Sequence, residues 1–384
     1  MKVLYISTPS FLDADLSYIR SLSNKIDVVY LMDLAPTSLK KTVLNIDKQI
    51  KNSDILPADN YAELQFFTDY MNCDSYVINR TVGKFLSLET LKMYFKIKKF
   101  IKQHNPDLIH YNNTVNLGIL GCLANNYKKI ITIHDPIPHI GDDNFTTRLV
   151  RKINFFCVKK YILLNQNQKE PFLKKYNIAS SNTYCSKLGV YDYYTHYYDS
   201  KIDENKSNKT VLFFGRIATY KGIDVLLKSF AQVREKFIDA KLIIAGSGTF
   251  NFDEFDTTQV TIINRYIETD ELFTLIKNSS FVICPYLEGT QSGVVMTSFS
   301  MYKPVIVTNV GGLSEMVTNK ETGLIIEPNN DQALSNAIVN LFENPNKLEL
   351  FSKNIKANYF NQGEFSWNTI SDDLVKVYKS LLQT

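Results

Sequence analysis

The feature that most constrains the fold of this chain is a repeated alternation of short apolar runs, rich in Val and Ile, with segments of helical periodicity. The runs are almost continuously apolar, as is typical of parallel strands whose sheet is covered by helices on both faces. They lie at residues 2–8, 27–33, 107–113, 129–135, 161–165, 210–216, 240–246, 260–266, 280–286, 304–310 and 323–328. The repeated strand–helix order predicts an α/β protein with doubly wound sheets.

A polar, charged segment without apolar periodicity, residues 191–210, interrupts this alternation. We place a domain boundary there, which gives a first domain over 1–190 and a second over 191–365. Each is long enough for one Rossmann-like domain, and such sheets bind ligands beyond the carboxyl ends of their strands. The expected architecture is two Rossmann-like domains that face a cleft.

Charge is distributed unevenly along the chain. The composition, 45% hydrophobic and 21% charged, excludes a disordered or fibrous protein. The formal net charge of +4 combines +9 over residues 1–190 with −5 over the remainder. Halves of opposite sign predict different partners for the two domains. No motif of the chain supports nucleic acid as one of them.

The sequence offers no segment for export or for membrane insertion. Its first 16 residues lack the long apolar stretch of a signal peptide and contain two aspartates. No apolar run approaches the roughly 18 residues of a spanning helix. We therefore expect a cytoplasmic protein, with peripheral attachment to the inner face of the cell membrane as an additional expectation.

The first motif with chemical content is FFGRIATYKG, residues 213–222, at the end of a predicted strand. Its tight turn can direct Arg216 and Lys221 toward one point in front of the sheet, where a diphosphate would lie. Arg offers a planar fork to phosphate oxygens, and Lys offers a point charge. The alternative is a surface loop with two solvated cations.

The second motif is YLEGTQSGVVMTSFSMYKPVIV, residues 286–307. A strand ends at Tyr286, and a helix begins at Ser292-Gly293, where unpaired N–H groups and the helix dipole favour a phosphate. Glu288 precedes this site and is suited to accept hydrogen bonds from sugar hydroxyls. Alternatively, Ser292 only caps its helix and Glu288 is a solvated turn residue.

Together these motifs resemble the C-terminal domain of the family 4 retaining glycosyltransferases, which have the GT-B fold. The order and spacing of the matching segments hold over roughly residues 200 to 345. The matching segments are GR-x4-KG, LIIAGSG, the RYIETDEL segment, SGVV, KPVIVTNVGGLSEMV and TGLIIEP.

The resemblance implies a role for each matching residue. Arg216 and Lys221 would bind the donor diphosphate, and Glu288 would contact the donor sugar. Gly215 is a further donor-site position. The backbone around Tyr266 and Ile267 would contact the base, Ser292, Gly293 and Val294 would hold the phosphate, and Thr297 takes the ribose position. The family commonly has a glutamate at the last position, where this chain has threonine, so ribose contact is expected to differ.

The first half resembles the family more weakly. His134, in the segment TIHDPIPHIG, takes the position of a histidine that faces the cleft, and His139 follows on the same loop. A histidine there can donate to a sugar hydroxyl or a phosphate. His110 is expected in the core, and Asp13 or Asp15 is expected to cap the helix after the first strand.

Two helices of the first half are rich in lysine and arginine. Residues 91–103 place lysines at helical spacing opposite Ile97 and Ile101, and residues 145–160 place Arg and Lys among aromatics. They are either ordinary amphipathic helices or faces attracted to anionic lipid. A last helix, 366–384, is expected to cross back to the first domain, with Trp367 as a packing anchor.

The sequence therefore predicts a retaining glycosyltransferase that moves a sugar from a nucleotide-diphospho-sugar, with UDP as the first expectation, to a glycan or lipid-linked acceptor in bacterial surface polysaccharide synthesis. No cofactor and no metal are expected, because no DxD-type carboxylate pair ends a strand near the cleft and Arg216 with Lys221 can stabilise the leaving diphosphate. Two alternatives are a non-catalytic nucleotide-sugar-binding subunit and a GT-B phosphorylase-like enzyme.

Overall fold

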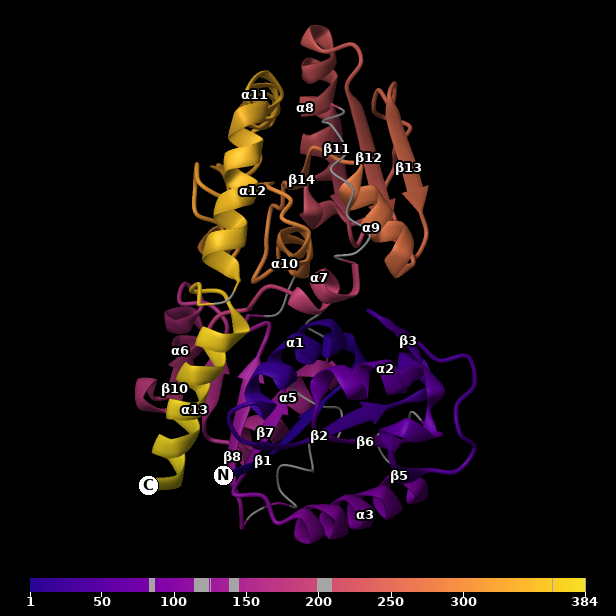
Figure 1. Cartoon of the computed structure of the whole chain (residues 1–384), viewed down its shortest axis with the longest axis vertical. Coiled ribbons are helices and arrows are strands. Elements are labelled where there is room, and N and C mark those ends of the chain that lie inside the picture. The colour runs from indigo at the N-terminus through magenta and orange to yellow at the C-terminus, as the bar shows by residue number, and fades with distance from the viewer. Residues whose placement is uncertain are drawn as a thin grey trace. The chain divides into compact units, whose positions relative to one another are not determined.

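The alternating apolar and amphipathic segments build two parallel sheets in the computed structural model, one in each of two units (Figure 1). Unit 1 comprises Met1–Gly189 and Trp367–Thr384, and unit 2 comprises Val190–Ser366. The structure describes residues 1–82, 87–113, 124, 126–137, 145–198, 209–360 and 362–383. His139, named above, lies outside these residues.

The sheet of unit 1 has eight strands in the order β10-β9-β8-β7-β1-β2-β6-β5. All neighbours are parallel except β5 and β6. The strands are β1 (Lys2–Ser7), β2 (Asp27–Leu34), β5 (Asp54–Pro57), β6 (Asp74–Asn79), β7 (Leu108–Asn112), β8 (Lys128–Ile133), β9 (Tyr161–Leu163) and β10 (Thr183–Cys185). From β6 to β9 this is the Rossmann order 3-2-1-4-5-6. The strands β1 and β7 are parallel, and the order in which successive strands are added to the sheet reverses between them. A separate small hairpin joins β3 (Lys40–Lys41) to β4 (Leu44–Asn45).

Amphipathic helices cover this sheet. They are α1 (Leu12–Ser23), α2 (Ala62–Met71), α3 (Leu88–His104), α5 (Phe145–Cys157), α6 (Lys169–Tyr176) and α13 (Trp367–Gln383). In α1, Leu12, Leu16, Ile19 and Leu22 recur at helical spacing and are all buried, so this side of the helix packs inward. Figure 1 shows α1 beside α2, and α1 also contacts α13.

Unit 2 repeats the Rossmann order in a fully parallel six-stranded sheet, β13-β12-β11-β14-β15-β16. Its strands are β11 (Thr210–Phe214), β12 (Lys241–Gly246), β13 (Val260–Asn264), β14 (Phe281–Cys284), β15 (Val305–Thr308) and β16 (Gly323–Ile326). Its helices are α7 (Asp192–Tyr198), α8 (Ile223–Lys236), α9 (Thr269–Lys277), α10 (Gly293–Ser300), α11 (Asp331–Glu343) and α12 (Pro345–Tyr359). The α/β fold class with two Rossmann-like halves is confirmed.

The start of the polar segment that we expected to be a linker is folded instead. Tyr191, Tyr193 and Tyr194 are buried, and α7 packs against α10 within unit 2. Thr195 Oγ1 donates to the carbonyl of Ser300 at the end of α10. Tyrosine rings supply the apolar area here, so a segment that looks polar in composition still has a side to bury.

The last helix, α13, packs on unit 1, as expected. The hydroxyl of Tyr378 forms a buried hydrogen bond of 2.7 Å with the hydroxyl of Tyr18, which lies on α1. Lys25 pairs with Asp372 at 2.5 Å. Trp367 is 6% exposed and packs against the Tyr18 ring, which confirms its role as a packing anchor.

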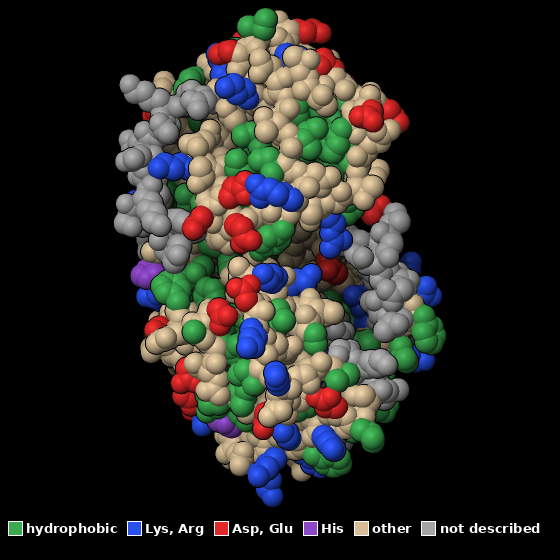
Figure 2. All heavy atoms as spheres, turned by 90° about the vertical axis from the view of Figure 1, so that its right-hand side faces the viewer, with side chains coloured by type: hydrophobic (Ala, Val, Ile, Leu, Met, Phe, Trp, Pro, Cys, Tyr) green, Lys and Arg blue, Asp and Glu red, His purple; other side chains and the backbone are tan. Residues whose placement is uncertain are grey.

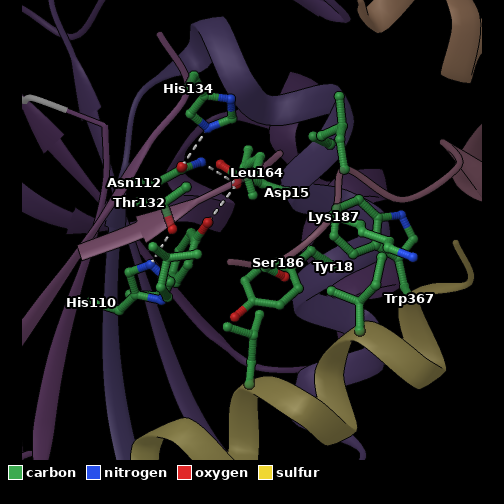
Figure 3. Close-up of a pocket in the computed structure, with 16 residues that line it drawn as sticks. Asp15, Tyr18, His110, Asn112, Thr132, His134, Leu164, Ser186, Lys187 and Trp367 are labelled. Atoms are coloured by element: carbon green, nitrogen blue, oxygen red, sulfur yellow. Dashed lines mark hydrogen bonds between the residues drawn. The ribbon is translucent and has the colours of Figure 1, made fainter. Parts of the chain in front are cut away.

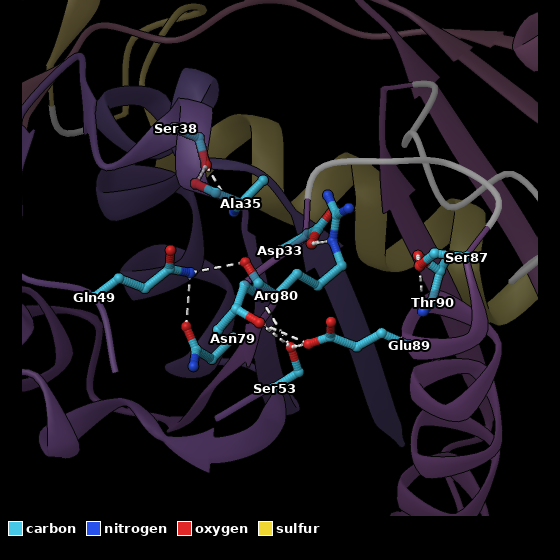
Figure 4. Close-up of polar contacts among 11 residues, drawn as sticks. Asp33, Ala35, Ser38, Gln49, Ser53, Asn79, Arg80, Ser87, Glu89 and Thr90 are labelled. Carbon is cyan, nitrogen blue, oxygen red and sulfur yellow. Dashed lines mark hydrogen bonds and ion pairs between the residues drawn. The ribbon is translucent and has the colours of Figure 1, made fainter. Parts of the chain in front are cut away.

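A buried ion pair lies at the carboxyl ends of β2 and β6 (Figure 4). Arg80 donates from Nε and Nη2 to the two carboxylate oxygens of Asp33, at 2.6 and 2.9 Å, and both residues are less than 5% exposed. Beside it, the buried Asn79 amide accepts from Gln49 and Tyr61. The contact of Gln49 with Asn79 attaches the segment before β5 to the carboxyl end of β6.

Candidate functional site

The two sequence motifs of unit 2 lie on either side of its topological switch point. Gly215 and Arg216 directly follow β11, the segment 285–292 follows β14, and these two strands are neighbours from which the sheet continues in opposite directions. Ligands of open α/β sheets bind at this position. The fold thus brings both motifs to the expected binding edge.

A glycine allows the loops after β11 and β14 to lie in close contact. Gly222 ends the turn Thr219–Lys221 with φ +68°, and a Cβ on it would lie 1.9 Å from the carbonyl oxygen of Pro285. Only glycine combines this backbone conformation with so close an approach. The N–H of Leu287 also donates to the carbonyl of Tyr220 at 2.8 Å. The position of Lys221 is therefore fixed relative to the loop after β14.

Lys221 lies over an aromatic ring of that loop. Its Nζ is 3.5 Å from the centroid of the buried Tyr286 ring, a cation–π contact. The Tyr286 hydroxyl is 3.1 Å from Oγ of Ser292, the residue that precedes α10. Burial raises the pKa of Tyr286 well above its ordinary value, so its hydroxyl stays protonated. A continuous set of contacts thus connects Lys221 with the start of α10.

The start of α10 has the form expected of an anion site rather than of a capped helix. The Ser292 side chain makes no capping hydrogen bond to the described part of the chain, where the acceptor of its N–H is the thioether sulfur of Met316, at 3.4 Å. Gly293 and Val294 are half-buried, and a Cβ on Gly215 would lie 3.3 Å from Val294. Four predicted donor-site residues therefore meet at one place. The capping alternative for Ser292 is wrong.

A pocket of about 490 Å³ opens next to these residues within unit 2. Four predicted residues line it, namely Gly215, Arg216, Tyr266 and Ile267. Arg216 is exposed and makes no hydrogen bond or ion pair to any residue that the structure describes. Its guanidinium is therefore available to a ligand in the pocket.

The AGSG segment also lines this pocket, and it makes close backbone contacts with the loop after β11. A Cβ on Gly246 would lie 1.8 Å from the carbonyl oxygen of Gly215, and one on Gly248 would lie 1.9 Å from that of Ile217. Oδ1 of Asn264 accepts from the N–H of Gly248, and Nδ2 of Asn264 donates to the Gly248 carbonyl. Because Gly246 and Gly248 have no Cβ, their segment can lie directly against the loop after β11.

Glu288 and Thr297 differ in their surroundings. Glu288 is half-buried in the turn after β14 and makes no hydrogen bond or ion pair within the described parts of the chain, as a sugar-binding carboxylate would require. Thr297 is 6% exposed on α10 and is absent from the lining of the pocket. Its location favours a packing role in the unliganded protein.

His134 belongs to unit 1, where it follows β8 (Figure 3). Its ring stacks on Phe11 at a centroid distance of 4.1 Å, and Nε2 is 2.7 Å from Oδ1 of Asn112. Burial lowers the pKa of His134 to about 4, although the nearby Asp135 acts in the opposite direction. The ring is therefore neutral at neutral pH. It lines a small pocket together with Asp15, Asn112 and side chains of α13.

His110, one strand away, is a core residue as expected. It is 1% exposed, its Nε2 is 2.7 Å from Oγ1 of Thr132, and its Nδ1 bonds to the Tyr378 hydroxyl. Burial lowers its pKa to about 3. The contact with Tyr378 attaches the last helix to the sheet.

Asp15 does not cap α1, contrary to expectation. The position before α1 is Phe11, and Asp15 points into the unit, where it is 1% exposed and accepts from Tyr5, Tyr30 and Asn112. Neither Asp15 nor Asn112 was predicted as part of a site. A signal was present for Asn112, since the run DLIHYNN ends in two polar residues at a strand end.

Exposed apolar and basic side chains share one side of α3. Leu88, Lys92, Phe95, Lys99 and Lys102 recur at spacings of four and three residues, and all five are exposed. On α5 the same spacing exposes Phe145, Leu149, Lys152 and Phe156. Figure 2 shows basic side chains among apolar ones on one face of unit 1, in the lower half of the view. Arg151 of α5 does not belong to these exposed side chains, because it is buried and its Nη1 donates to the Pro136 carbonyl and to the Tyr176 hydroxyl.

Comparisons with known proteins agree with this geometry. Residues 208–344 match the family model "Glycosyl transferases group 1", and residues 24–165 match "Glycosyl transferase 4-like". Together the two matches span more than half of the chain and fall one in each unit. The chain belongs to the GT4-type glycosyltransferases.

Relatives of this glycosyltransferase come from archaea and bacteria. An uncharacterized glycosyltransferase of Methanocaldococcus jannaschii is 27% identical over 88% of this chain and 93% of its own length. The capsular polysaccharide biosynthesis glycosyltransferase CapM of Staphylococcus aureus is 27% identical over 76% of this chain and 82% of its own length. Both alignments extend over the two units.

The fold of this glycosyltransferase is shared with solved GT-B enzymes. Anabaena HepE, in a crystal structure with UDP-glucose, matches with a TM-score of 0.67 at 17% identity, over 99% of this chain and 100% of HepE. At this identity the likeness shows the fold alone. Among the described helices, none is both long enough and apolar enough to cross a bilayer.

Proposed function

We propose that this glycosyltransferase transfers a sugar, with retention of its anomeric configuration, from a nucleotide-diphospho-sugar to a glycan or lipid-linked acceptor in bacterial surface polysaccharide synthesis. The observation that carries the proposal is the convergence of Arg216, Lys221 and the start of α10 at the switch point of unit 2. Two cations and a set of helix N–H groups complement the negative charge of a diphosphate.

A UDP-sugar is the donor that we propose to test first. The relative HepE is solved with UDP-glucose, and the pocket of about 490 Å³ beside Arg216 is large enough for a nucleoside. Tyr266 and Ile267 line this pocket and would contact the base, while Glu288 would hold sugar hydroxyls.

The chemistry follows from the charges of the site. The bond from the anomeric carbon to the diphosphate oxygen breaks, and the acceptor oxygen bonds to the same face of the sugar. The leaving diphosphate takes the acceptor proton. Arg216, Lys221 and the N–H groups of α10 stabilise the negative charge that develops on the leaving group, so that no bound metal is needed for this step.

The test is a thermal-shift panel of nucleotide sugars followed by transfer assays. A donor at 100 times its dissociation constant stabilises the protein by about 2.7 kcal/mol. UDP-glucose, the other common nucleotide sugars and inorganic phosphate with a hexose form the arms. Stabilisation and turnover by phosphate alone would favour the phosphorylase-like alternative. An inverted anomer in the product would contradict retention.

We further propose that unit 1 docks on the anionic inner face of the cell membrane, where a lipid-linked acceptor would be found. The exposed stripe on α3, defined by Leu88, Lys92, Phe95, Lys99 and Lys102, combines apolar insertion with positive charge. Neutralising the three lysines with glutamine should remove about 3 kcal/mol of binding to phosphatidylglycerol vesicles, at about 1 kcal/mol each.

The vesicle experiment has a matched control in unit 2. Lys228, Lys241 and Lys353 are exposed, and their replacement by glutamine changes the net charge equally. This control should keep vesicle binding. If both triple variants lost vesicle binding equally, the loss would be due to net charge and not to the stripe on α3. Exposed charges are screened within about 10 Å at 0.1 M salt, so vesicle binding that does not respond to salt would contradict docking through them.

A further inference from the structure

Two arginines line the pocket beside β11 in unit 2, and they differ in their partners. Arg216 makes no hydrogen bond or ion pair to a described residue, whereas Arg265 forms a bidentate ion pair with Glu271. Nη1 of Arg265 donates to Oε2 of Glu271 and Nη2 donates to Oε1, both at 2.7 Å. These hydrogen bonds lower the pKa of Glu271, so its carboxylate is charged at neutral pH. The charge of Arg265 is therefore balanced, and of the two arginines Arg216 is the one available to a diphosphate.

The ion pair closes a short loop that lines the pocket. Arg265 directly follows β13, and Glu271 lies in the first turn of α9. The same Nη1 of Arg265 also donates to the carbonyl of Tyr266, at 3.1 Å. Phe273 and Ile276 are buried and hold α9 in unit 2. Glu271 is thus a fixed point to which the loop is attached.

The loop is also fixed on its other side, and one peptide backbone position within it stays available. Asn264, the last residue of β13, exchanges two hydrogen bonds with the backbone of Gly248. The N–H and C=O of Ile267 make no hydrogen bond within the described parts of the chain. Because Ile267 lines the pocket, it offers one donor and one acceptor to a ligand there. A nucleobase has both kinds of group on its Watson–Crick edge.

The contribution of this ion pair to folding is expected to be small. The side chains of Arg265 and Glu271 are 55% and 33% exposed, and exposed ion pairs add little to stability. Their geometric effect on the loop is different, because a loop that is ordered before the ligand arrives does not have to be ordered during binding.

We propose that Arg265 and Glu271 are positioning residues that hold the loop of Ile267 in its base-binding conformation. They would thereby determine the affinity for the nucleoside part of the donor and not the affinity for its diphosphate. The inference rests on the proposed function, in which Tyr266 and Ile267 contact the base.

The test is calorimetric titration of the full chain with pyrophosphate and with UDP, ADP and GDP, of which the tightest-binding nucleotide is used to compare variants. Arg265→Ala and Glu271→Ala should each weaken nucleotide binding by about tenfold, since hydrogen bonds to the base are lost. Pyrophosphate binding should not change. The double variant should lose no more than either single variant, because the two residues act as a unit.

The two single variants separate positioning from electrostatics. Arg265→Ala removes a positive charge and Glu271→Ala removes a negative one, so an effect of charge on an anionic ligand would have opposite signs. Positioning predicts the same sign for both. In transfer assays, KM for the donor should rise while kcat is unchanged, because the base is bound equally in the ground state and the transition state.

A matched control breaks an exposed ion pair elsewhere in unit 2. Lys209 precedes β11, at the amino end of the sheet, and pairs with Asp239 at 2.7 Å. Lys209→Ala should keep the affinities for nucleotide and for pyrophosphate. The unfolding temperature of each ligand-free variant is measured in parallel and should stay near that of the wild type.

Several outcomes would overturn the inference while leaving the proposed function intact. These are unchanged nucleotide affinity in both single variants, changes of opposite sign, equal losses for nucleotide and pyrophosphate, and a wild type that binds nucleotide no more tightly than pyrophosphate. A wild type that binds neither pyrophosphate nor any of the three nucleotides would contradict the proposed function itself, so the two failures are distinguishable.

Discussion

The ammonium group of Lys221 lies 3.5 Å from the centroid of the Tyr286 ring, and the Tyr286 hydroxyl reaches Ser292 at the start of α10. A cation of the first motif is thereby placed by an aromatic residue of the second, although 65 positions separate them in the chain. The contact joins the two motifs within one candidate site. Neither motif alone fixes where the charge of Lys221 is presented.

Removal of either cation should impair transfer. Arg216→Ala or Lys221→Ala deletes a charge-assisted contact to the leaving diphosphate, which contributes about 1.5 to 3 kcal/mol. We expect kcat/KM to fall by roughly one to two orders of magnitude at saturating acceptor. The control is Lys228→Ala on α8, an exposed lysine outside the site. Full activity of Arg216→Ala would refute the diphosphate role.

Gly222→Ala should destabilise unit 2. The new Cβ would lie 1.9 Å from the Pro285 carbonyl oxygen, at a backbone φ of +68° that already costs an L residue about 1 kcal/mol. We expect the free energy of unfolding in urea to fall by at least this amount, and the clash to separate the two loops. In Gly289→Ala the nearest atom would be 3.5 Å away, so this variant should have near wild-type stability.

His110 should lower the stability of unit 1 on mild acidification, while Asp13 and Asp15, whose pKa values are raised by burial to about 7, act in the opposite direction. Burial lowers the pKa of His110 to about 3 from 6.5, so the unfolded chain binds a proton that the folded chain does not. This histidine therefore contributes stability that is complete above pH 6.5 and is lost as the pH falls toward 3, with a slope near 1.4 kcal/mol per pH unit. His110→Gln should lower that slope between pH 6.5 and 4.5 in urea titrations. An unchanged slope would mean that His110 is protonated in the folded protein.

Breaking the buried ion pair should cost more than breaking an exposed one. Arg80→Met leaves the Asp33 carboxylate buried without its partner, for which we expect a loss of about 3 to 5 kcal/mol. The exposed pair of Lys376 and Asp373 gives the comparison, and Lys376→Met should cost no more than about 1 kcal/mol. Equal losses would show that water reaches Asp33 in the folded protein.

The strands that the sequence predicts correctly are those with uninterrupted apolar runs. All eleven predicted runs overlap a strand of the two large sheets. The strands of these two sheets that were missed are β5, β6 and β10, and the short strands β3 and β4 of the separate hairpin were missed as well. β5 ends in proline and begins with aspartate, and the first residues of β6 are polar, because these strands lie toward one edge of their sheet, where fewer side chains are buried.

The candidate site was only partly predictable for a related reason. Arg216, Lys221 and the start of α10 stand in local motifs, so spacing along the chain is enough to find them. Asp15 and Asn112 acquire their relationship through strand order, because β1 and β7 are neighbours although about 100 residues lie between them. No local pattern records such a contact, and an aspartate near a helix start has the same appearance as a cap.

The discontinuity of unit 1 has a consequence for how the protein is made. The chain leaves this unit at Gly189 and returns at Trp367, whose ring lies so close that a Cβ on Gly189 would be 2.6 Å from it. All of unit 2 is synthesised between these two contacts. During translation unit 2 can fold while unit 1 still lacks α13, so a ribosome stalled before residue 367 would carry one finished domain and one open sheet. A chain truncated before residue 367 would therefore expose the apolar surface of unit 1 that α13 covers.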